Sequence, residues 1–306
     1  MSVKVEALTK IYGQQKAVNN ITFEAHKGEI LGFLGPNGAG KTTTMKIITG
    51  FLLPSSGTVD VCGINVLDNP IAASSKIGYL PENNPLYLTM YVKEYLSFTA
   101  GLYKLKNAKQ RVAEMIEMTG LEKEQHKKIG QLSKGYKQRV GLAQAMIHDP
   151  EVLILDEPTS GLDPNQLVEI RGLIQSLGKE KTVIFSTHIM QEVQALCNRV
   201  IIINNGELVA NDPIDQLESR ISGFSKIIVE FDTEIDINTL RSMQGVKQVE
   251  VSPDNKNKFT LTCQSDMDIR PAISKAAREN DWTILELQKE SFSVEKAFQF
   301  LTSSAR

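Results

Sequence analysis

Short apolar segments separated by turn residues dominate the beginning of the chain. Residues 3–12 and 21–35 are apolar or alternate between apolar and polar positions, with glycine-containing polar turns among them. Alternation of this kind predicts β-strands. Residues 41–48 change to helical spacing, and Gly50 follows as a candidate C-cap. A strand, a loop and a helix in this order predict a βα unit.

The middle of the chain first loses the strand pattern and then regains it. Residues 85–148 carry helical spacing with few turn signals, which predicts an inserted helical subdomain. Residues 152–155 and 182–185 are apolar runs, and each is followed by a helical segment. Strands that alternate with helices predict a parallel sheet with crossover helices, so the expected fold class is α/β. Asn205-Gly206 between two apolar runs adds a hairpin.

A second module is predicted after a boundary marked by Pro213 and a Ser-Gly pair. The expected domains are residues 1–219 and 220–306. Strand and helix patterns in the second domain follow the order β-α-β-β-α-β, which is typical of a split βαβ module of α+β type. The expected strands are residues 226–231, 246–251, 259–263 and 282–287, and the expected helices are residues 236–243, 269–279 and 293–301.

Composition narrows the range of partners. The 306 residues include 34 Lys and Arg against 36 Asp and Glu, so the formal net charge of −2 gives no general basic field for nucleic acid. The cysteines, Cys62, Cys197 and Cys263, lack the spacing of a disulfide framework or a zinc site, which favours a reducing cytoplasm. No apolar run approaches the roughly 20 residues of a membrane span, and no signal-peptide pattern is present. Any membrane-spanning part is therefore expected to be another chain.

A phosphate-binding motif is the most specific feature of the sequence. Residues 35–42 fit G-x-x-x-x-G-K-[ST], and they lie between the predicted strand at residues 30–34 and a helix. Glycines let backbone N–H groups converge on phosphate oxygens, and the helix N-terminus adds positive potential. Lys41 is expected to bind the β- and γ-phosphates of ATP, and Thr42 to coordinate Mg²⁺. The expected nucleotide-binding residues here are Gly35, Pro36, Asn37, Gly38, Ala39, Gly40, Lys41, Thr42 and Thr43.

Two carboxylates follow the apolar run at residues 152–155. Asp156 and Glu157 would lie at the carboxyl edge of the parallel sheet, where α/β proteins bind their ligands. Asp156 is suited to hold Mg²⁺ through water, and Glu157 to polarise the water that attacks the γ-phosphate. The alternative is that both residues only cap the next helix, since Asp-Glu-Pro is also good capping chemistry.

Three further motifs follow the phosphate-binding loop along the chain. The first, Leu132-Ser133-Lys134-Gly135-Tyr136, precedes a helical run expected at residues 137–147. The second, Ser160-Gly161-Leu162-Asp163, follows Glu157, and the third is His188 after the strand at residues 182–185. Together they make residues 3 to about 215 resemble the ATP-binding subunits of ABC transporters. The implied fold is a P-loop NTPase of ABC type with a mixed sheet core and an inserted helical subdomain. The signature residues are Leu132, Ser133, Lys134, Gly135 and Tyr136, and the D-loop residues are Ser160, Gly161, Leu162 and Asp163.

The resemblance implies that two subunits share each site. Each ATP would lie between the phosphate loop of one subunit and the signature of the other, with Ser133 and Gly135 facing a γ-phosphate. His188 would sense that phosphate. Tyr12 would stack on adenine, although a lone tyrosine at a strand end is more often half-buried structure. The other histidines, His26, His126 and His148, lie in polar or turn-like surroundings and are expected to be solvated.

Two motifs depart from the family pattern. Glu82 stands where most members have the Q-loop glutamine, and its carboxylate could ligate Mg²⁺ while adding negative charge beside the triphosphate. Lys134 and Tyr136 replace the commonest signature residues, a variant associated with the ABC-2 branch of exporters. Residues 80–87 and 126–135 are also similar to gliding-motility-associated ABC-2 ATPases of Bacteroidetes.

The expected function is that of an ATP-hydrolysing subunit that closes as a homodimer on two Mg-ATP and powers an ABC-2-type exporter, with gliding or secretion as the output. Its partners would be integral membrane permease subunits, and its place the cytoplasmic face of the cell membrane. Two alternatives stay open, a soluble ABC-type ATPase on a ribosome or nucleic-acid complex and a nucleotide-binding regulatory subunit with little turnover. Tyr87, Tyr91, Tyr95 and Phe98 recur at helical spacing and are expected to divide between core and permease docking.

Overall fold

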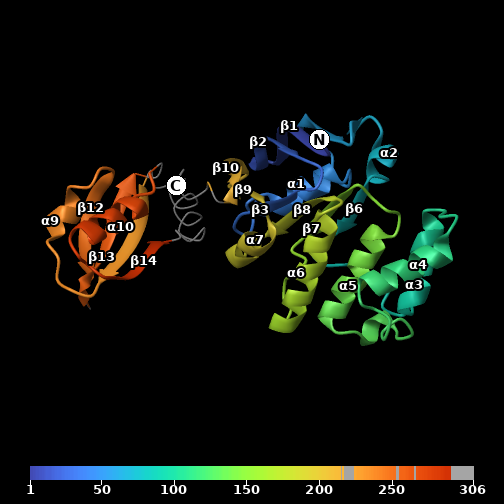
Figure 1. Ribbon diagram of the computed structural model, residues 1–306. Coiled ribbons are helices and arrows are strands. Elements are labelled where there is room, and N and C mark those ends of the chain that lie inside the picture. The colour runs from blue at the N-terminus through green and yellow to red at the C-terminus, as the bar shows by residue number, and fades with distance from the viewer. Residues whose placement is uncertain (215, 217–223, 253–254, 265–266, 291–306) are drawn as a thin grey trace. The chain divides into compact units, whose positions relative to one another are not determined.

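The computed structural model describes residues 1–214, 216, 224–252, 255–264 and 267–290. The chain divides into two compact units, Met1–Pro213 and Ile214–Arg306 (Figure 1). Each unit has buried apolar clusters of its own. The helix expected at residues 293–301 lies outside the described residues.

Two sheets form the framework of the first unit. One is antiparallel and has the strand order β2-β1-β4-β5. The other has the order β10-β9-β3-β8-β7-β6, in which β10 is antiparallel to β9 and the remaining neighbours are parallel. The strands are β1 Val3–Tyr12, β2 Gln15–Ala25, β3 Ile30–Leu34, β4 Ser56–Val61, β5 Ile64–Asn65, β6 Ile77–Leu80, β7 Val152–Asp156, β8 Thr182–Thr187, β9 Arg199–Asn204 and β10 Glu207–Pro213.

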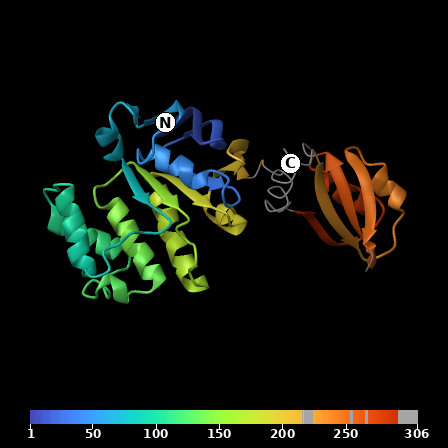
Figure 2. The same cartoon turned by 180° about the vertical axis from the view of Figure 1, so that it is seen from behind.

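Helices cover both faces of the mixed sheet, as the views from opposite sides show (Figures 1 and 2). Helix α1 contacts the antiparallel sheet through β2 and β4 and the mixed sheet through β7. Helices α3, α4 and α5 form the expected helical subdomain. The helices are α1 Lys41–Ile48, α2 Pro70–Ser74, α3 Val92–Leu102, α4 Ala108–Met118, the 3₁₀ helix η1 Ile129–Gln131, α5 Lys134–Met146, α6 Pro164–Gly178 and α7 Met190–Leu196.

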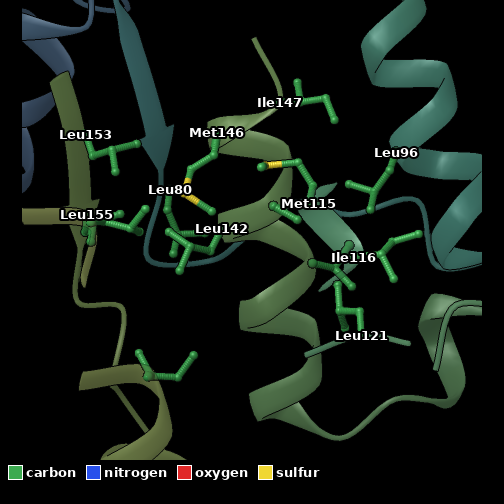
Figure 3. Close-up of a cluster of buried hydrophobic side chains, with 14 of the residues drawn as sticks. Leu80, Leu96, Met115, Ile116, Leu121, Leu142, Met146, Ile147, Leu153 and Leu155 are labelled. Carbon is green, nitrogen blue, oxygen red and sulfur yellow. The ribbon is translucent and has the colours of Figure 1, made fainter. Parts of the chain in front are cut away.

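Strand β7 shows how the sheet separates the core into two clusters. Successive side chains of a strand point to opposite faces. Val152 and Ile154 pack with α1 and the antiparallel sheet, whereas Leu153 and Leu155 pack with the helical subdomain and α6. Figure 3 shows Leu142 of α5 among the residues of this second cluster. Both faces of β7 are therefore buried, which is why its sequence is a continuous apolar run.

In residues 224–252, 255–264 and 267–290, the second unit consists of one antiparallel sheet and two helices. Its strand order is β12-β13-β11-β14, and the helices lie between β11 and β12 and between β13 and β14 in the chain. This confirms the β-α-β-β-α-β order and, with the mixed sheet of the first unit, the expected fold class. The elements are β11 Phe224–Phe231, α9 Ile237–Arg241, β12 Val246–Ser252, β13 Asn255–Gln264, α10 Arg270–Glu279 and β14 Ile284–Glu290.

Element boundaries differ from the sequence prediction at several places. Strand β2 begins at Gln15 instead of residue 21, because the pairing of Tyr12 with Gln15 continues the ladder directly from the turn. Helix α5 begins at Lys134, before the expected residue 137, because the Ser133 hydroxyl accepts a hydrogen bond from Tyr136 N at 3.4 Å and caps the helix. Gly135 therefore lies in the first turn of the helix.

The aromatic residues of the helical subdomain are divided between surface and core. Tyr95 is buried and donates a hydrogen bond to Gln144 Oε1 at 2.6 Å, whereas Tyr87, Tyr91 and Phe98 are exposed. In the described part of the chain, no helix has the length and apolar character to cross a bilayer.

The prediction that His148 is solvated is wrong. Its ring stacks on Tyr103 with the centroids 4.1 Å apart, and Nε2 lies 3.0 Å from the carbonyl oxygen of Ile77. Because a carbonyl oxygen only accepts, Nε2 carries the proton. Burial lowers the pKa of His148, which favours this neutral form. His26 and His126 are exposed, as expected.

Candidate nucleotide-binding site

The strand order of the mixed sheet brings the predicted site residues together. Strands β3, β8, β7 and β6 are neighbours, and all four are parallel. Their carboxyl ends therefore meet at one edge of the sheet, where the segments that follow them converge. A cavity of about 420 Å³ lies at this edge. Its lining consists of Ala17, Asn37, Gly38, Gly40, Lys41, Thr42, Thr43, Glu82, Glu157, Ser160 and His188.

The loop between β3 and α1 requires glycine where it passes β2. Gly40 has a φ of +108°, and a Cβ on it would lie 2.4 Å from the carbonyl oxygen of Ala17. No side chain fits there without moving the backbone. Ala17 was not identified from the sequence, because an alanine in a strand pattern carries no chemical signal. The close approach packs the end of the loop, at the N-terminus of α1, against β2.

Lys41 is buried and turns back over its own loop. Its Nζ donates hydrogen bonds to the carbonyl oxygens of Gly35 at 2.8 Å and Pro36 at 3.3 Å, and it lies 3.6 Å from Glu157 Oε1. The loop is further closed by Ala39 N, which donates to Pro36 O at 3.1 Å. An ammonium group held by these backbone carbonyl oxygens, at the N-terminus of a helix, forms a site of positive potential for an anion.

Glu157 joins the loop to the segment after β8. Its carboxylate lies between Lys41 and His188, whose Nδ1 is 2.8 Å from Oε2. Because a carboxylate oxygen accepts, this contact places a proton on Nδ1. Glu157 is 6% exposed, whereas the His188 side chain is 45% exposed at the mouth of the cavity. Glu157 also has a φ of +51°, an uncommon conformation for a residue with a side chain.

Ser186 of β8 holds both acidic residues of β7 and the turn after it. Its hydroxyl donates to Asp156 Oδ1 and accepts from Glu157 N, the latter at 3.1 Å. Ser186 was missed at the sequence level, and the available signal was a polar residue at the end of a buried strand. Asp156 is fully buried, and its second oxygen, Oδ2, has no hydrogen-bond partner among the residues that the structure describes. An unpartnered buried carboxylate oxygen is a strong acceptor for a cation or a water.

Glu82 is an exposed residue that follows β6 and lines two adjoining cavities. With Thr42 it lines the 420 Å³ cavity and a second cavity of about 730 Å³, which also reaches Asp156. The three side chains thus present oxygen atoms around the same region. In the described residues no group of three or more His, Cys, Asp or Glu could hold a metal ion alone. A metal bound here would need further ligands, such as phosphate oxygens and water.

The remaining predicted residues lie elsewhere in the first unit. Tyr12 is 49% exposed at the end of β1, with Lys10 Nζ 5.2 Å from its ring centroid. The described lining of the 420 Å³ cavity contains Ser160 but none of the signature residues. Ser133 is exposed, and Asp163 caps α6 by accepting from Gln166 N at 2.9 Å. Of the other signature residues, Leu132 is buried, and Lys134, Gly135 and Tyr136 form the first turn of α5. Of the other D-loop residues, Gly161 lies beside Lys134 Nζ, and Leu162 packs on the hydrophobic core.

Known proteins are similar to this chain in sequence and in fold. Residues 18–160 match the protein family described as ABC transporter. The bacitracin transport ATP-binding protein BcrA of Bacillus licheniformis is 40% identical over 249 residues, which are 77% of this chain and 80% of that protein. The linearmycin resistance ATP-binding protein LnrL of Bacillus subtilis strain 168 is 34% identical over 305 residues and 98% of both chains.

A solved structure gives the same result for the fold. The dimeric ATP-binding cassette MJ0796, in a post-hydrolysis state bound to ADP and Pi, superposes with a TM-score of 0.64 at 26% identity, over 69% of this chain and 98% of the cassette. An ATP-binding subunit of an ABC transporter superposes with a TM-score of 0.66 at 29% identity, over 72% of this chain and 93% of that subunit. The chain therefore belongs to the ATP-binding proteins of the ABC transporter family and is an ABC ATPase.

Proposed function

We propose that this ATPase is the motor subunit of an ABC-2-type exporter and works as a homodimer at the cytoplasmic face of the membrane. The observation that carries the proposal is the match to the linearmycin resistance protein along 98% of both chains, which includes the second unit. The match to a bacitracin transport protein points in the same direction. The signature variant with Lys134 and Tyr136 agrees with the ABC-2 branch.

The phosphate loop would bind the triphosphate of ATP. Phosphate oxygens offer Lys41 negatively charged acceptors in place of the neutral carbonyl oxygens of Gly35 and Pro36, so attraction between opposite charges is added to the hydrogen bonds. The N–H groups of residues 38–43 lie at the N-terminus of α1, where the helix dipole favours negative charge. Tyr12, exposed at the end of β1, would stack on the adenine base.

Glu157 and His188 would carry the hydrolysis step. Glu157 is positioned to accept a proton from the water that attacks the γ-phosphate, since its carboxylate already lies between the loop lysine and His188. His188 would bind the γ-phosphate through its exposed ring and hold Glu157 through Nδ1. The bond between them makes the position of the base depend on the sensor of the phosphate.

The residues present fit Mg²⁺ beside the nucleotide. Asp156 Oδ2 is buried and unpartnered, and Thr42 and Glu82 border the same region. Mg²⁺ usually takes one or two carboxylates together with phosphate oxygens and waters, and it would offset charge on the phosphates. Ser186 would fix the Asp156 side chain for this contact through Oδ1. Glu82 would supply a carboxylate oxygen where an amide oxygen is usual.

The signature segment would complete the site of the second subunit. Ser133 Oγ accepts from Tyr136 N at 3.4 Å and from Gln166 Nε2 at 3.3 Å. Because both lone pairs are occupied, the hydroxyl proton is left to donate to an external acceptor. Ser133 is exposed, so a γ-phosphate on a partner subunit could be that acceptor.

We expect Ser133→Ala to weaken ATP-dependent dimerisation, measured by sedimentation in the Glu157→Gln background, and to leave ATP binding by the monomer unchanged. Unchanged dimerisation would contradict this role for Ser133.

The exporter proposal is tested by isolating the protein with its partners. Tagged Glu157→Gln protein, which should hold ATP and stay closed, is purified from detergent-solubilised membranes of its own organism with Mg-ATP, and the accompanying chains are identified by mass spectrometry. Lys41→Ala protein is the matched control, because it should not close. A polytopic membrane protein that follows Glu157→Gln but not Lys41→Ala supports the exporter. Ribosomal or DNA-associated proteins without a membrane chain would overturn it in favour of a soluble ATPase.

The finer proposal concerns the physiological output. We propose gliding or secretion as that output, on the resemblance that we expect from the sequence of residues 80–87 and 126–135 alone. A strain that carries only the Glu157→Gln form should lose colony spreading or the secreted product. Normal spreading and secretion in that strain would contradict both outputs. A purified protein that binds ATP without turnover would instead indicate a regulatory subunit.

A further inference from the structure

A buried glutamate behind the candidate site has no part in the chemistry described so far. Glu192 lies in the first turn of α7 and is fully buried. It lines neither of the two cavities at the sheet edge. A carboxylate is costly to remove from water unless its oxygens are bonded, so its partners indicate what it does.

One oxygen of Glu192 joins two segments that flank the site. Glu192 Oε2 accepts hydrogen bonds from Thr159 Oγ1 at 2.6 Å and from Thr187 Oγ1 at 2.9 Å. Thr159 is two residues after Glu157 and directly before the D-loop, whereas Thr187 ends β8 directly before His188. A single atom therefore holds the residue that leads into the D-loop and the residue that leads into the switch histidine.

The hydroxyl of Thr187 passes the constraint on to the backbone. While it donates to Glu192, it accepts from Ile189 N at 3.0 Å. His188 thus lies between two residues that are fixed by the same hydroxyl group. The second threonine, Thr159, is fixed by its bond to Glu192 and lies two residues after Glu157. The carboxylate oxygen Oε2 of Glu157 lies 2.8 Å from His188 Nδ1. The segments that contain Thr159 and Thr187 are therefore joined twice, by Glu192 and by the bond between Glu157 and His188.

The second oxygen of Glu192 makes only a long ion pair with Arg171, so this pair is not the main contact of the side chain. Within the described part of the chain, Oε1 has no hydrogen-bond partner, and Arg171 Nη2 of α6 lies 3.9 Å away. Arg171 Nε is also buried and has no hydrogen-bond partner in the described residues. A buried ion pair with such loose geometry does not repay its desolvation well. The short bonds to the two threonines are the better-satisfied part of the cluster.

We propose that Glu192 is a positioning residue that couples the D-loop to the switch histidine through Thr159 and Thr187. It would set the distance between Glu157 and His188, so that a change at the D-loop reaches the hydrolytic pair in the same subunit. This inference rests on the proposed roles of Glu157 and His188. A displacement of about 1 Å can cost up to about 100-fold in rate, so a lost tether should slow turnover without reducing ATP binding.

The test removes each hydroxyl without changing the shape of the side chain. Thr187→Val and Thr159→Val should each lower kcat about tenfold and leave the KM for ATP unchanged, because neither residue lines the nucleotide cavity. Thr187→Ser and Thr159→Ser keep the hydroxyl and should restore kcat. Glu192→Asp keeps the charge but shortens the side chain, so it should resemble the valine variants.

A spectroscopic measurement separates positioning from a purely structural role. The full chain has four histidines, so selective ¹⁵N labelling gives a small set of imidazole signals, and His188→Ala assigns that of His188. We expect Thr187→Val to shift the Nδ1 signal of His188 toward that of Glu157→Gln, while Thr187→Ser does not. A Thr187→Val protein with a lower melting temperature but an unchanged kcat and an unchanged His188 signal would overturn the proposal. A fully active Glu157→Gln would instead overturn the roles on which it rests.

Discussion

At the scale of single residues, Glu157 has a strained backbone conformation in addition to a buried carboxylate. Its φ of +51° is a conformation that costs about 1–3 kcal/mol for a residue with a side chain. The surroundings hold it there, since its backbone N donates to both Ser186 O and Ser186 Oγ at 3.1 Å. The turn directs its carboxylate toward Lys41 and His188. Strain held by neighbouring bonds is a feature of functional sites, and here it fixes the geometry before ATP binds.

We expect Glu157→Gln to lose hydrolysis and to keep ATP binding. The amide is almost the same size as the carboxylate, but it cannot accept a proton, and general-base catalysis contributes about 100- to 10,000-fold. Phosphate release and binding of a fluorescent ATP analogue measure the two effects separately. Glu180→Gln, an exposed residue on the turn after α6, is the control. Turnover within a few-fold of the unchanged protein would exclude Glu157 as the base.

We expect Lys41→Ala to weaken ATP binding by about 10- to 100-fold, because a hydrogen bond to a charged group contributes about 1.5–3 kcal/mol. Isothermal titration with ATP measures the change. Lys93→Ala removes an exposed lysine that does not line the nucleotide cavity, and it should bind ATP as the unchanged protein does. Equal affinity in both variants would contradict the placement of the phosphates at Lys41.

The limits of sequence reasoning are clear at this scale. Asp156 and Glu157 could be placed at the sheet edge, because an apolar run announces a buried strand and the acids follow it. The polar residue Ser186 at the end of β8 was a signal, but its pairing with Asp156 could not be predicted, because it depends on β8 lying next to β7 in the sheet. The same holds for Glu192, whose threonine partner Thr159 is distant in the sequence. Contacts across strands depend on topology, which local patterns do not contain.

At the scale of elements, one ion pair joins the starts of β3 and β9. Arg199 Nε donates to Glu29 Oε1 at 2.7 Å, and Arg199 Nη2 donates to Oε2 at 3.1 Å. Burial raises the pKa of Glu29, but the hydrogen bonds from Arg199 and from His26 N outweigh it, so the pKa lies below its usual 4.5. The charged form is therefore stabilised in the folded state. Its contribution is fully present above the usual pKa and is lost as the pH falls through the lowered pKa.

Glu29→Gln should lower the free energy of unfolding by about 1–3 kcal/mol near neutral pH, because it leaves Arg199 without its charged acceptor. The difference from the unchanged protein should shrink below pH 4.5, since acid also neutralises Glu29 itself. Urea unfolding at several pH values measures it. Glu6→Gln, in the exposed pair with Lys4, should have little effect at any pH. A Glu29→Gln difference that does not change with pH would contradict this account.

Element starts and ends were the other part that the sequence did not determine. The spacing of apolar residues predicted helix α5 but not its first turn. That turn depends on the cap by Ser133, and the sequence prediction left it outside the helix. Strand β2 likewise gains its first residues from pairing with β1 and not from its own pattern. Apolar periodicity therefore located the elements, whereas hydrogen bonds to neighbours decided where they begin.

At the scale of the whole molecule, the two units have separate cores. The two large clusters of the first unit contain only residues before Pro213, and the cluster of the second unit is built from β11–β14, α9 and α10. The described lining of the cavity that contains Lys41, Glu157 and His188 also comes from the first unit. A unit with its own core and its own site should fold and bind its ligand independently.

We therefore expect a fragment of residues 1–213 to unfold cooperatively and to bind ATP within about twofold of the full chain, because no described residue of the second unit lines the cavity. Thermal unfolding with and without ATP measures both properties, since a ligand that binds only the folded state raises Tm. The same fragment with Lys41→Ala should fold but lose the shift. If the fragment folds and ATP no longer raises its Tm, the second unit takes part in the nucleotide site. If the shift is retained, any role of the second unit must lie outside ATP binding.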